Sequence, residues 1–372
     1  MQVVLQQELW QRHFSLCPHQ RKGKKKQKPQ NSHVQVEPRQ EQEKKPKPMK
    51  IKKILGITVA TAVIFSQSAR AGQTGNSTDT SKDGKVVAEV APEKGAPLPL
   101  HEIEGNGGVL TTLSAYIVNP PRSGQAVGLP SIGTGFISLG NGRALVPTTL
   151  TWSPWERIEL GYGFDWYALG PLPNAIHNAT GVSIGKSSVS LHNFNARFAF
   201  LKENEFNQKW LPAITGGVHY KINDGISSIN QNLGGALTSI GIPYNQGVDF
   251  TLYASKLITF LPRPVLINAG GRATRGQELG LLGFSNNYSF LFEGNVAVFL
   301  TDWLILAGEY RQQPNDYKPI PGVINKSGDW WTVDLAWVVN KHLTIAGGYG
   351  HFGQVGNQLA NGVWGFTAKY EF

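Results

Sequence analysis

The sequence predicts an all-β fold, namely a transmembrane antiparallel β-barrel of about 12 strands, within a range of about 10 to 14. Three observations predict it. The last twelve residues alternate with a period of two and end on an aromatic residue. Similar runs follow one another from about residue 131, separated by connections that are alternately short and long. Most tryptophans fall near the ends of these runs, where a membrane interface would place them.

The terminal strand, residues 361–372, has two chemically different faces. Apolar and aromatic side chains occupy one face, and small or charged side chains occupy the other: Trp364, Phe366, Ala368, Tyr370 and Phe372 against Gly365, Thr367, Lys369 and Glu371. An outer-membrane barrel turns the first kind of face to lipid and the second to its lumen. The final Phe372 resembles the C-terminal aromatic residue by which such barrels are recognised for assembly, so we expect it to be an assembly signal.

The positive charge of the chain is concentrated in its leader. The formal net charge is +10. Residues 1–48 hold 11 Lys and Arg against 4 Glu, and residues 49–71 add four basic residues, which leaves about −1 for residues 72–372. The basic balance therefore gives no reason to expect a nucleic-acid partner. We interpret residues 1–48, a basic low-complexity extension, as the product of a mis-assigned start; the alternative is a real disordered segment.

Residues 49–71 have the pattern of a secretory signal peptide. A basic start precedes an apolar run, residues 54–65, and Ala69-Arg70-Ala71 supplies a small-residue cleavage site. The apolar run is too short to span a bilayer as a helix, so we expect export with cleavage rather than anchoring. The single cysteine, Cys17, lies upstream of this segment. A thiol-free mature chain is compatible with the bacterial envelope.

The remaining chain is expected to hold a flexible periplasmic segment, residues 72–106, and the barrel domain, residues 107–372. The first is polar and contains a proline-rich stretch. Residues 109–119 form a run that is either a plug, a periplasmic strand, or an extra barrel strand if the barrel has fourteen. Otherwise, counting the strands back from a C terminus that must be periplasmic gives an even number, twelve, beginning near Ser131. Asn141-Gly142 is expected to form a hairpin turn of type I′.

The predicted strands alternate in the length of their connections. Short turns are expected at residues 202–209, 259–264, 300–302 and 340–341, and long loops at 169–187, 222–246, 275–287, 312–329 and 352–361. Short periplasmic turns opposite long extracellular loops are typical of transmembrane barrels. The tryptophans of residues 72–372 form two expected girdles, Trp152, Trp155, Trp210, Trp303 and Trp337 toward the short turns, and Trp166, Trp330, Trp331 and Trp364 toward the long loops.

Several stretches resemble a bacterial envelope family defined as domain of unknown function 3034. The stretches are IEGNGG (103–108), WERIELGYG (155–163), WLPAITGGVHYK (210–221), RATRGQELGLLGF (272–284), EYRQQP (309–314) and DWWTVDLAWVVNKHLTIAGGY (329–349). The similarity runs from about residue 103 to the C terminus. It implies an outer-membrane location in a Gram-negative bacterium and no established activity.

Charged residues on the expected inward faces are candidates for lining a pore: Arg157, Glu159, Asp165, Arg197, Asp249, Arg272, Glu293, Glu309, Arg311, Asp334 and Lys369. Both signs are present. One interpretation is an aqueous pore whose charges set its selectivity. The other is a lumen filled by mutually paired charges, because unpaired charges away from water are costly. A twelve-strand wall is compatible with both.

Two further features bear on function. The loop at residues 275–284 is apolar, so it is expected either to fold inward as a constriction, to bind a hydrophobic ligand or partner, or to pack against neighbouring loops. Ser190 and His192 share one face of a strand and resemble the Ser/His pair of outer-membrane phospholipases, but no orienting carboxylate or amide can be assigned. His101 and Glu102 lack the further ligands of a metal site, and we expect no metal or cofactor.

The function that we expect is that of a non-enzymatic bacterial outer-membrane barrel, a passive pore or uptake channel for a small solute. The leading alternative is a closed barrel with a structural or partner-binding role. An outer-membrane lipid hydrolase is the third. The expected partners are outer-membrane lipid, lipopolysaccharide and the barrel assembly machinery.

Overall fold

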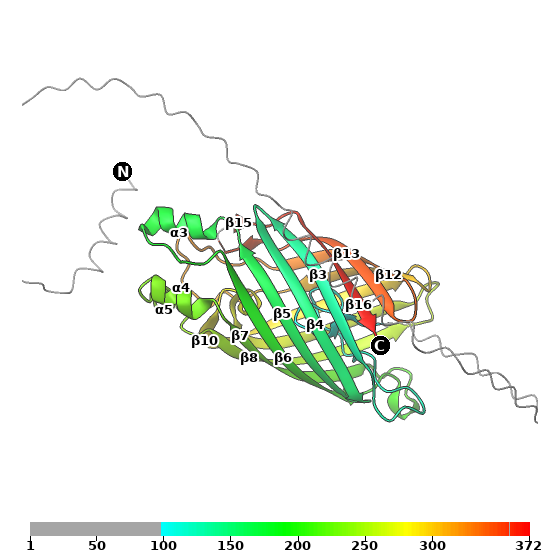
Figure 1. Ribbon diagram of the computed structural model, residues 1–372. Coiled ribbons are helices and arrows are strands. Elements are labelled where there is room, and N and C mark those ends of the chain that lie inside the picture. Colours follow the sequence, from blue (N-terminus) through cyan, green and yellow to red (C-terminus); the bar gives the residue numbers. More distant parts are fainter. Residues whose placement is uncertain (1–97, 357) are drawn as a thin grey trace, which may run out of the picture. The chain divides into compact units, whose positions relative to one another are not determined.

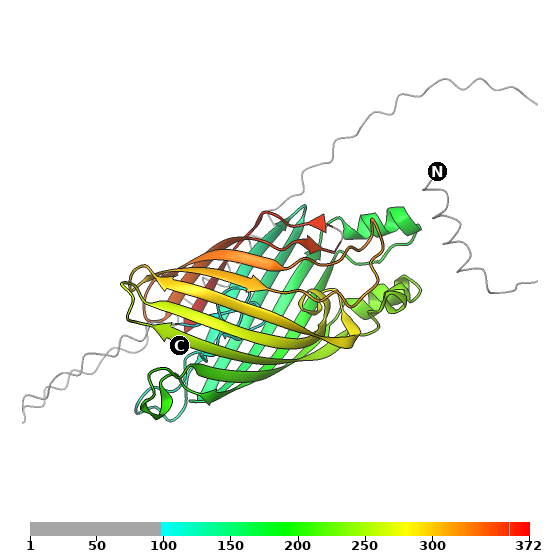
Figure 2. The same cartoon turned by 180° about the vertical axis from the view of Figure 1, so that it is seen from behind.

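The computed structural model describes residues 98–372 except residue 357. Twelve strands close into one antiparallel barrel (Figures 1 and 2), as predicted. Neighbours pair in chain order, and the last strand closes the wall against the first, with Glu371 opposite Ser131. The strands are β3 (Pro130–Gly140), β4 (Arg143–Trp155), β5 (Ile158–Leu169), β6 (Ser188–Leu201), β7 (Ala213–Asn223), β8 (Gln246–Ile258), β9 (Val265–Gly276), β10 (Phe284–Phe299), β11 (Leu304–Arg311), β12 (Trp330–Val338), β13 (Leu343–His351) and β16 (Val363–Glu371).

The period of two in the sequence becomes the two faces of the wall. In β12, Thr332 and Asp334 are buried toward the lumen, whereas Val333 and Leu335 are exposed on the outside. The terminal strand β16 has the two faces that its alternation predicts. Large apolar side chains also cover the outside of other strands, among them Leu150, Leu160, Phe194, Phe250, Leu252 and Leu306. An apolar outer band around a polar interior is the arrangement of a transmembrane barrel.

The two ends of the barrel differ in the length of their connections. The short-turn end carries the turns after β4, β6, β8, β10 and β12, including a 3₁₀ turn, η3 (Glu205–Asn207). The opposite, long-loop end carries α3 (Leu172–Thr180), α4 (Ile226–Asn232) and α5 (Ala236–Ile240), which gather on one side of Figure 1. Asn141 and Gly142 both have positive φ, 51° and 74°, as a type I′ turn requires. Among the described residues, no helix is long and apolar enough to cross a bilayer.

Residues 98–118 lie inside the barrel and form what we call the plug, and the exposed residues 122–127 lie between the plug and the first barrel strand. Two short strands, β1 (Leu100–His101) and β2 (Gly107–Gly108), pair within it. Residues 99–108 and 110–115 are buried throughout. Residues 98–106, expected in the flexible periplasmic segment, and residues 109–118 both form part of this plug, and neither stretch supplies a strand of the wall. The predictions for residues 1–48, 49–71 and 72–97 lie outside the described residues.

The connections at the long-loop end form a cap, which we define as residues 170–187, 224–245, 277–283, 312–329 and 352–362. Besides the three helices it contains η4 (Gln277–Gly280), β14 (Gln354–Val355) and β15 (Gln358–Leu359). Its apolar residues form one buried cluster with wall residues at the long-loop end. The cluster includes the cap residues Ile176, Ile229, Ile240, Leu279, Leu281 and Val355. The apolar loop at 275–284 thus folds inward and packs against neighbouring loops.

The tryptophans follow the predicted girdles with one exception. Trp152, Trp155, Trp303 and Trp337 are exposed near the short-turn end, and Trp331 and Trp364 are exposed near the long-loop end. Trp330 was assigned wrongly, because its side chain is 2% exposed and stacks on Phe352 with ring centroids 4.1 Å apart. It begins β12 on the inward face and belongs to the apolar cluster of the cap.

Candidate functional site

The part of the plug that reaches the middle of the barrel is the tight loop between β1 and β2. Backbone hydrogen bonds close it, from Glu102 N to Asn106 O and from Gly105 N to Glu102 O, both 2.9 Å. Ser114 N then donates to Gly107 O at 3.0 Å and folds the following segment back. The loop presents Glu104, which is 0% exposed, to the surrounding wall.

Glycines allow the backbone of this loop to lie directly against β5. A Cβ atom at Gly161 would lie 2.2 Å from Gly105 O, and one at Gly163 would lie 2.4 Å from Glu104 O. Gly105 itself has a φ of +88°, a left-handed conformation that glycine adopts without strain. The glycines of IEGNGG and WERIELGYG, far apart in the sequence, therefore serve the same contact.

The carboxylate of Glu104 lies at the centre of a buried ion-pair network. Arg272 donates to its Oε2 at 2.6 Å, the ammonium group of Lys221 forms a second ion pair, and Arg311 approaches to 3.5 Å. None of these four side chains is more than 2% exposed. A buried charge is tolerated only where opposite charges and hydrogen bonds replace water, and this network supplies both.

Two wall carboxylates complete the network. Asp249 accepts from Lys221 at 2.7 Å and from Arg272 at 3.0 Å. Glu293 accepts from Arg272 Nε at 2.8 Å and forms an ion pair with Arg311, whose Nε lies 3.2 Å away. Lys221, Arg272 and Arg311 each therefore reach both a plug carboxylate and a wall carboxylate. The plug is a member of the network and does not merely fill space beside it.

A second attachment involves Glu309 of β11 and three consecutive backbone amides of the plug. Its carboxylate oxygens accept from the N–H groups of Leu110 at 3.1 Å, Thr111 at 3.0 Å and Thr112 at 2.8 Å. Thr332 Oγ1 lies 3.0 Å from the same carboxylate. Successive N–H groups that point to one anion make a backbone nest. Here the wall supplies the anion and the plug supplies the nest.

A third attachment uses the pair of Glu159 and Arg197. The two side chains are 2.8 Å apart. Glu159 accepts from Gly107 N at 3.1 Å and from Val118 N at 2.7 Å. Arg197 donates to Gly107 O at 3.1 Å and to the carbonyl of Ser114. The ion pair thus holds both ends of the plug segment 107–118.

Most of the predicted pore-lining charges face this interior. Those in direct contact with the plug are Glu159, Arg197, Arg272, Glu309, Arg311 and Lys369, which donates to Pro99 O at 2.6 Å. Asp249 and Glu293 pair with these cations, Asp165 accepts from Asn193 at 2.9 Å, and Asp334 accepts from Thr332 at 2.6 Å. Whether they line a pore stays a prediction, because the plug occupies the space in front of them.

Arg157 was placed wrongly. It lies in the turn before β5, its side chain is 34% exposed, and it pairs with Glu205 at the short-turn end. The alternation of β5 begins only at Ile158, so the periodicity did not determine the orientation of Arg157. Phe372, the predicted assembly signal, is 44% exposed at the same end, and its N–H donates to Pro130 O at 3.3 Å.

Two central residues of the network were missed from the sequence. Lys221 follows the inward alternation of Thr215, Gly217 and His219 in β7, so the period of two contained the signal that would have identified it. Glu104 lies in a segment whose proline-rich approach suggested flexibility, and only the IEGNGG stretch indicated an ordered role.

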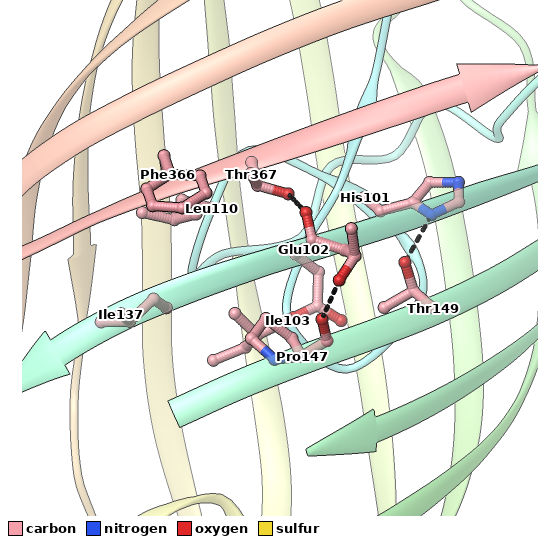
Figure 3. A pocket seen from close by; sticks show the side chains of 10 residues that line it. His101, Glu102, Ile103, Leu110, Ile137, Pro147, Thr149, Phe366 and Thr367 are labelled. Carbon is pink, nitrogen blue, oxygen red and sulfur yellow. Dashed lines mark hydrogen bonds between the residues drawn. The ribbon is translucent and has the colours of Figure 1, made fainter. Parts of the chain in front are cut away.

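The plug and the wall leave a small cavity between them. A cavity of about 10 Å³ lies between the plug and the wall strands β3, β4 and β16, beside His101, Ile137 and Thr149 (Figure 3). His101 bonds Thr149 Oγ1 at 2.8 Å and Ser131 Oγ at 2.6 Å across this side of the plug. Such a volume suffices for about one water molecule and not for a solute. Among the described residues, no group of His, Cys, Asp and Glu is arranged to hold a metal ion.

The cap has one buried carboxyl of its own, Glu278. It accepts from Ser327 Oγ at 2.8 Å and from Gly356 N at 2.9 Å and so ties together three cap loops. Burial raises the pKa of Glu278 to about 7, and the hydrogen bonds from Gly356 and Ser327 and the nearby guanidinium of Arg143 oppose this rise only in part. Burial and the charge of Glu278 also raise the pKa of Tyr317 to about 12.

The structure does not bring Ser190 and His192 together as a catalytic pair. His192 Nδ1 lies 2.9 Å from the hydroxyl of Tyr162. The backbone N–H of Ser190 donates to Asp224 at 2.9 Å. Among the hydrogen bonds of the described residues, none joins the two side chains, and none supplies His192 with an orienting carboxylate.

Solved structures of other barrels are similar to this chain at low identity. The NanC porin is 10% identical with a TM-score of 0.41, covering 65% of this chain and 98% of the porin. The COG4313 outer membrane channel from Pseudomonas putida F1 is 10% identical with a TM-score of 0.38, covering 66% and 96%. The Salmonella typhi outer membrane phospholipase is 10% identical with a TM-score of 0.33, covering 67% and 94%.

The family comparison is more specific than these similarities. No curated protein matches the chain at a significant level. The model of the family described as "Protein of unknown function (DUF3034)" matches residues 143–365, which is more than half of the 372 residues. The matched part contains the whole wall from β4 to β13, all of the cap, and every wall charge of the Glu104 network. The chain therefore belongs to the DUF3034 family.

Proposed function

We propose that this protein is a channel of the bacterial outer membrane for a small solute, held closed in its resting state by the plug. In this arrangement the short-turn end and Phe372 face the periplasm and the long-loop end faces outward. Outer-membrane lipid and lipopolysaccharide surround the apolar band, and the barrel assembly machinery inserts the protein. The solute enters only after the plug has moved.

The observation that carries the proposal is how the wall charges are satisfied. Glu309 and Glu159 are bound by backbone N–H groups of the plug, and Arg197 and Arg311 are bound by its carbonyl oxygens. Water can replace each of these groups if the plug leaves. A lumen that was always filled would gain stability from apolar packing in place of buried ions. A polar wall matched to a polar insert favours an insert that can be displaced.

The width of the barrel agrees with this proposal. Eight strands leave an interior that side chains alone can fill, and sixteen or more leave an open aqueous channel. Twelve strands lie between these limits. This chain fills the intermediate space with a folded segment, so removal of that segment would leave a passage lined by charges of both signs.

The decisive experiment displaces the plug without touching a charge. In Gly163→Val the new Cβ would lie 2.4 Å from Glu104 O, which is closer than van der Waals contact allows. We therefore expect this substitution to expel the loop from the lumen. The matched control is Gly308→Ala in β11, where a Cβ would come no nearer than 3.9 Å to any neighbour. Both proteins start at residue 72, and folding is verified by the shift in gel migration on boiling.

Single-channel recording in a planar bilayer gives the answer. We expect the unsubstituted chain and Gly308→Ala to be silent and Gly163→Val to give discrete conductance steps. In the opened protein, Glu309→Ala should shift ion selectivity toward anions, because it removes a negative charge from the lining. A folded Gly163→Val protein that has released its plug and still conducts nothing would refute the channel and favour a closed barrel with a structural or partner-binding role.

A further inference from the structure

Lys221 contacts both the plug and the cap. It lies near the long-loop end of β7, and its side chain is fully buried. Its ammonium group pairs with Glu104 of the plug and with Asp249 of the wall, the latter at 2.7 Å. The same group donates to the carbonyl oxygen of Leu279 in the cap at 3.1 Å. One side chain therefore joins the plug, the wall and the cap.

Asn223, two residues farther along β7, extends this contact with the cap. Its Nδ2 donates to Gly280 O and to Leu281 O, both at 3.0 Å. Its Oδ1 accepts from Gly225 N at 2.9 Å, which fixes the orientation of the amide. Together with Lys221 it binds three consecutive carbonyl groups of the cap. The inward face at the end of β7 thus holds the segment from Leu279 to Leu281.

The segment that is held has an unfavourable backbone conformation. Glu278 has a φ of 49° and Leu279 a φ of 67°. L-residues other than Asn and Asp seldom adopt such values, and they persist only where the surroundings enforce them. Lys221 and Asn223 hold the segment from the lumen, and Ser327 and Gly356 hold the Glu278 carboxyl from the other cap loops. Loss of the lumen contacts would let the segment relax.

We propose that Lys221 couples the plug to the cap, so that displacement of the plug loosens the long-loop end of the barrel. The proposal rests on the proposed function, because it requires a plug that can leave. When Glu104 withdraws, the ammonium group loses one of its two carboxylates and gains access to water. Water then competes with the Leu279 carbonyl for the ammonium group. By reciprocity, loosening of the cap must weaken the binding of the plug.

Two cysteine reporters separate movement of the plug from movement of the cap. The chain from residue 72 contains no cysteine, because the single cysteine is Cys17. Ala115→Cys places a thiol in the plug, and Ala360→Cys places one in the cap; both alanines are 2% exposed. The measurement is the rate at which a maleimide labels each reporter in the folded barrel. Combined with Gly163→Val, both reporters should label faster, the cap reporter by about tenfold, a size typical of coupled sites.

The role of Lys221 is tested in the same assay. With Lys221→Met, we expect the cap reporter to label quickly from the start and to respond less than about twofold to Gly163→Val, because the coupling is lost. Asn223→Ala is the second variant, which keeps the ion pairs and removes only the bonds to Gly280 and Leu281. Arg197→Met is the matched control: this buried cation contacts the plug and Glu159, so the response of the cap should persist.

The possible outcomes are distinct. If Gly163→Val exposes the plug reporter and leaves the cap reporter unchanged, the coupling is wrong and the channel can still be right. If the cap responds fully in both the Lys221→Met and the Asn223→Ala proteins, the coupling does not pass through β7 and the inference fails. If the plug reporter labels quickly and still no conductance appears, the proposed function itself fails.

Discussion

The backbone N–H of Thr111 lies 3.0 Å from both carboxylate oxygens of Glu309. Such a symmetrical contact centres the carboxylate on the nest formed with the neighbouring amides of Leu110 and Thr112. Hydrogen bonds to a buried charge are about twice as strong as those between neutral groups. The contact therefore makes Glu309 one of the main anchors of the plug.

Glu309→Ala should release this part of the plug. Loss of the charge leaves three buried N–H groups without their acceptor, and we expect a decrease of about 2 to 4 kcal/mol in the free energy that holds the plug. The labelling rate of Ala115→Cys measures the change. Glu156→Gln, on an exposed turn, should not alter that rate, because its partner Lys202 is also exposed. An unchanged rate in Glu309→Ala would show that the nest does not anchor the plug.

Arg272→Met should be among the most destabilising substitutions in the barrel. Arg272 forms ion pairs with Glu104, Asp249 and Glu293. Its removal leaves the negative charge of these buried carboxylates only partly compensated. Breaking a buried network in this way costs about 3 to 5 kcal/mol, measured as the free energy of unfolding in urea. Arg157→Met, in a partly exposed pair, should cost less than about 1 kcal/mol.

The same network allows a rescue. Adding Glu104→Gln to Arg272→Met removes one of the charges that Arg272 had neutralised, so the double variant should be more stable than Arg272→Met alone. If the two effects simply add, Arg272 and Glu104 act independently and the centre of the network lies elsewhere.

The cap should lose stability as the pH rises. The pKa of Glu278 is raised from 4.5 in the unfolded chain to about 7 in the folded cap, so the folded cap binds the proton more tightly. Its contribution is fully present below pH 4.5, declines as the pH rises toward 7, and levels off above it. The total change is about 3 kcal/mol. Labelling of Ala360→Cys between pH 4 and 9, divided at each pH by the labelling rate of the unfolded chain to correct for ionisation of the thiol, measures this profile, and Glu278→Gln should flatten it.

The fold could be predicted from the sequence because alternate residues of each strand in a transmembrane barrel face two different environments. In β12 and β16, lipid and lumen demand opposite chemistry at every second position, so local pattern and global structure agree. The Asn141-Gly142 turn was equally predictable, since it needs two positive φ values and this dipeptide supplies them at low cost.

The plug and the cap could not be predicted in the same way, because neither has a period. Leu110 of the plug and Glu309 of the wall, which are joined by a hydrogen bond, are 199 positions apart, and no local pattern shows which segment will enter the barrel. Trp330 illustrates the same limit: an aromatic residue at a strand end fits a girdle as well as an apolar cap, and only the contact with Phe352 decides. Arg157 lay one residue outside the alternation that appeared to include it.

The outer face of β12 provides a test of the membrane assignment that is independent of the plug. Val333 lies between the exposed Trp331 and Trp337 and is 49% exposed itself, whereas Val339 lies beyond the strand at the short-turn end. If lipid covers this face, an arginine must be desolvated at position 333 and can reach the interface at position 339. Val333→Arg should therefore lower the free energy of unfolding in lipid vesicles by about 2 to 4 kcal/mol, and Val339→Arg by about 0 to 1 kcal/mol. Equal effects at the two positions would mean that no hydrocarbon layer surrounds β12, and the transmembrane assignment of the barrel would have to be abandoned.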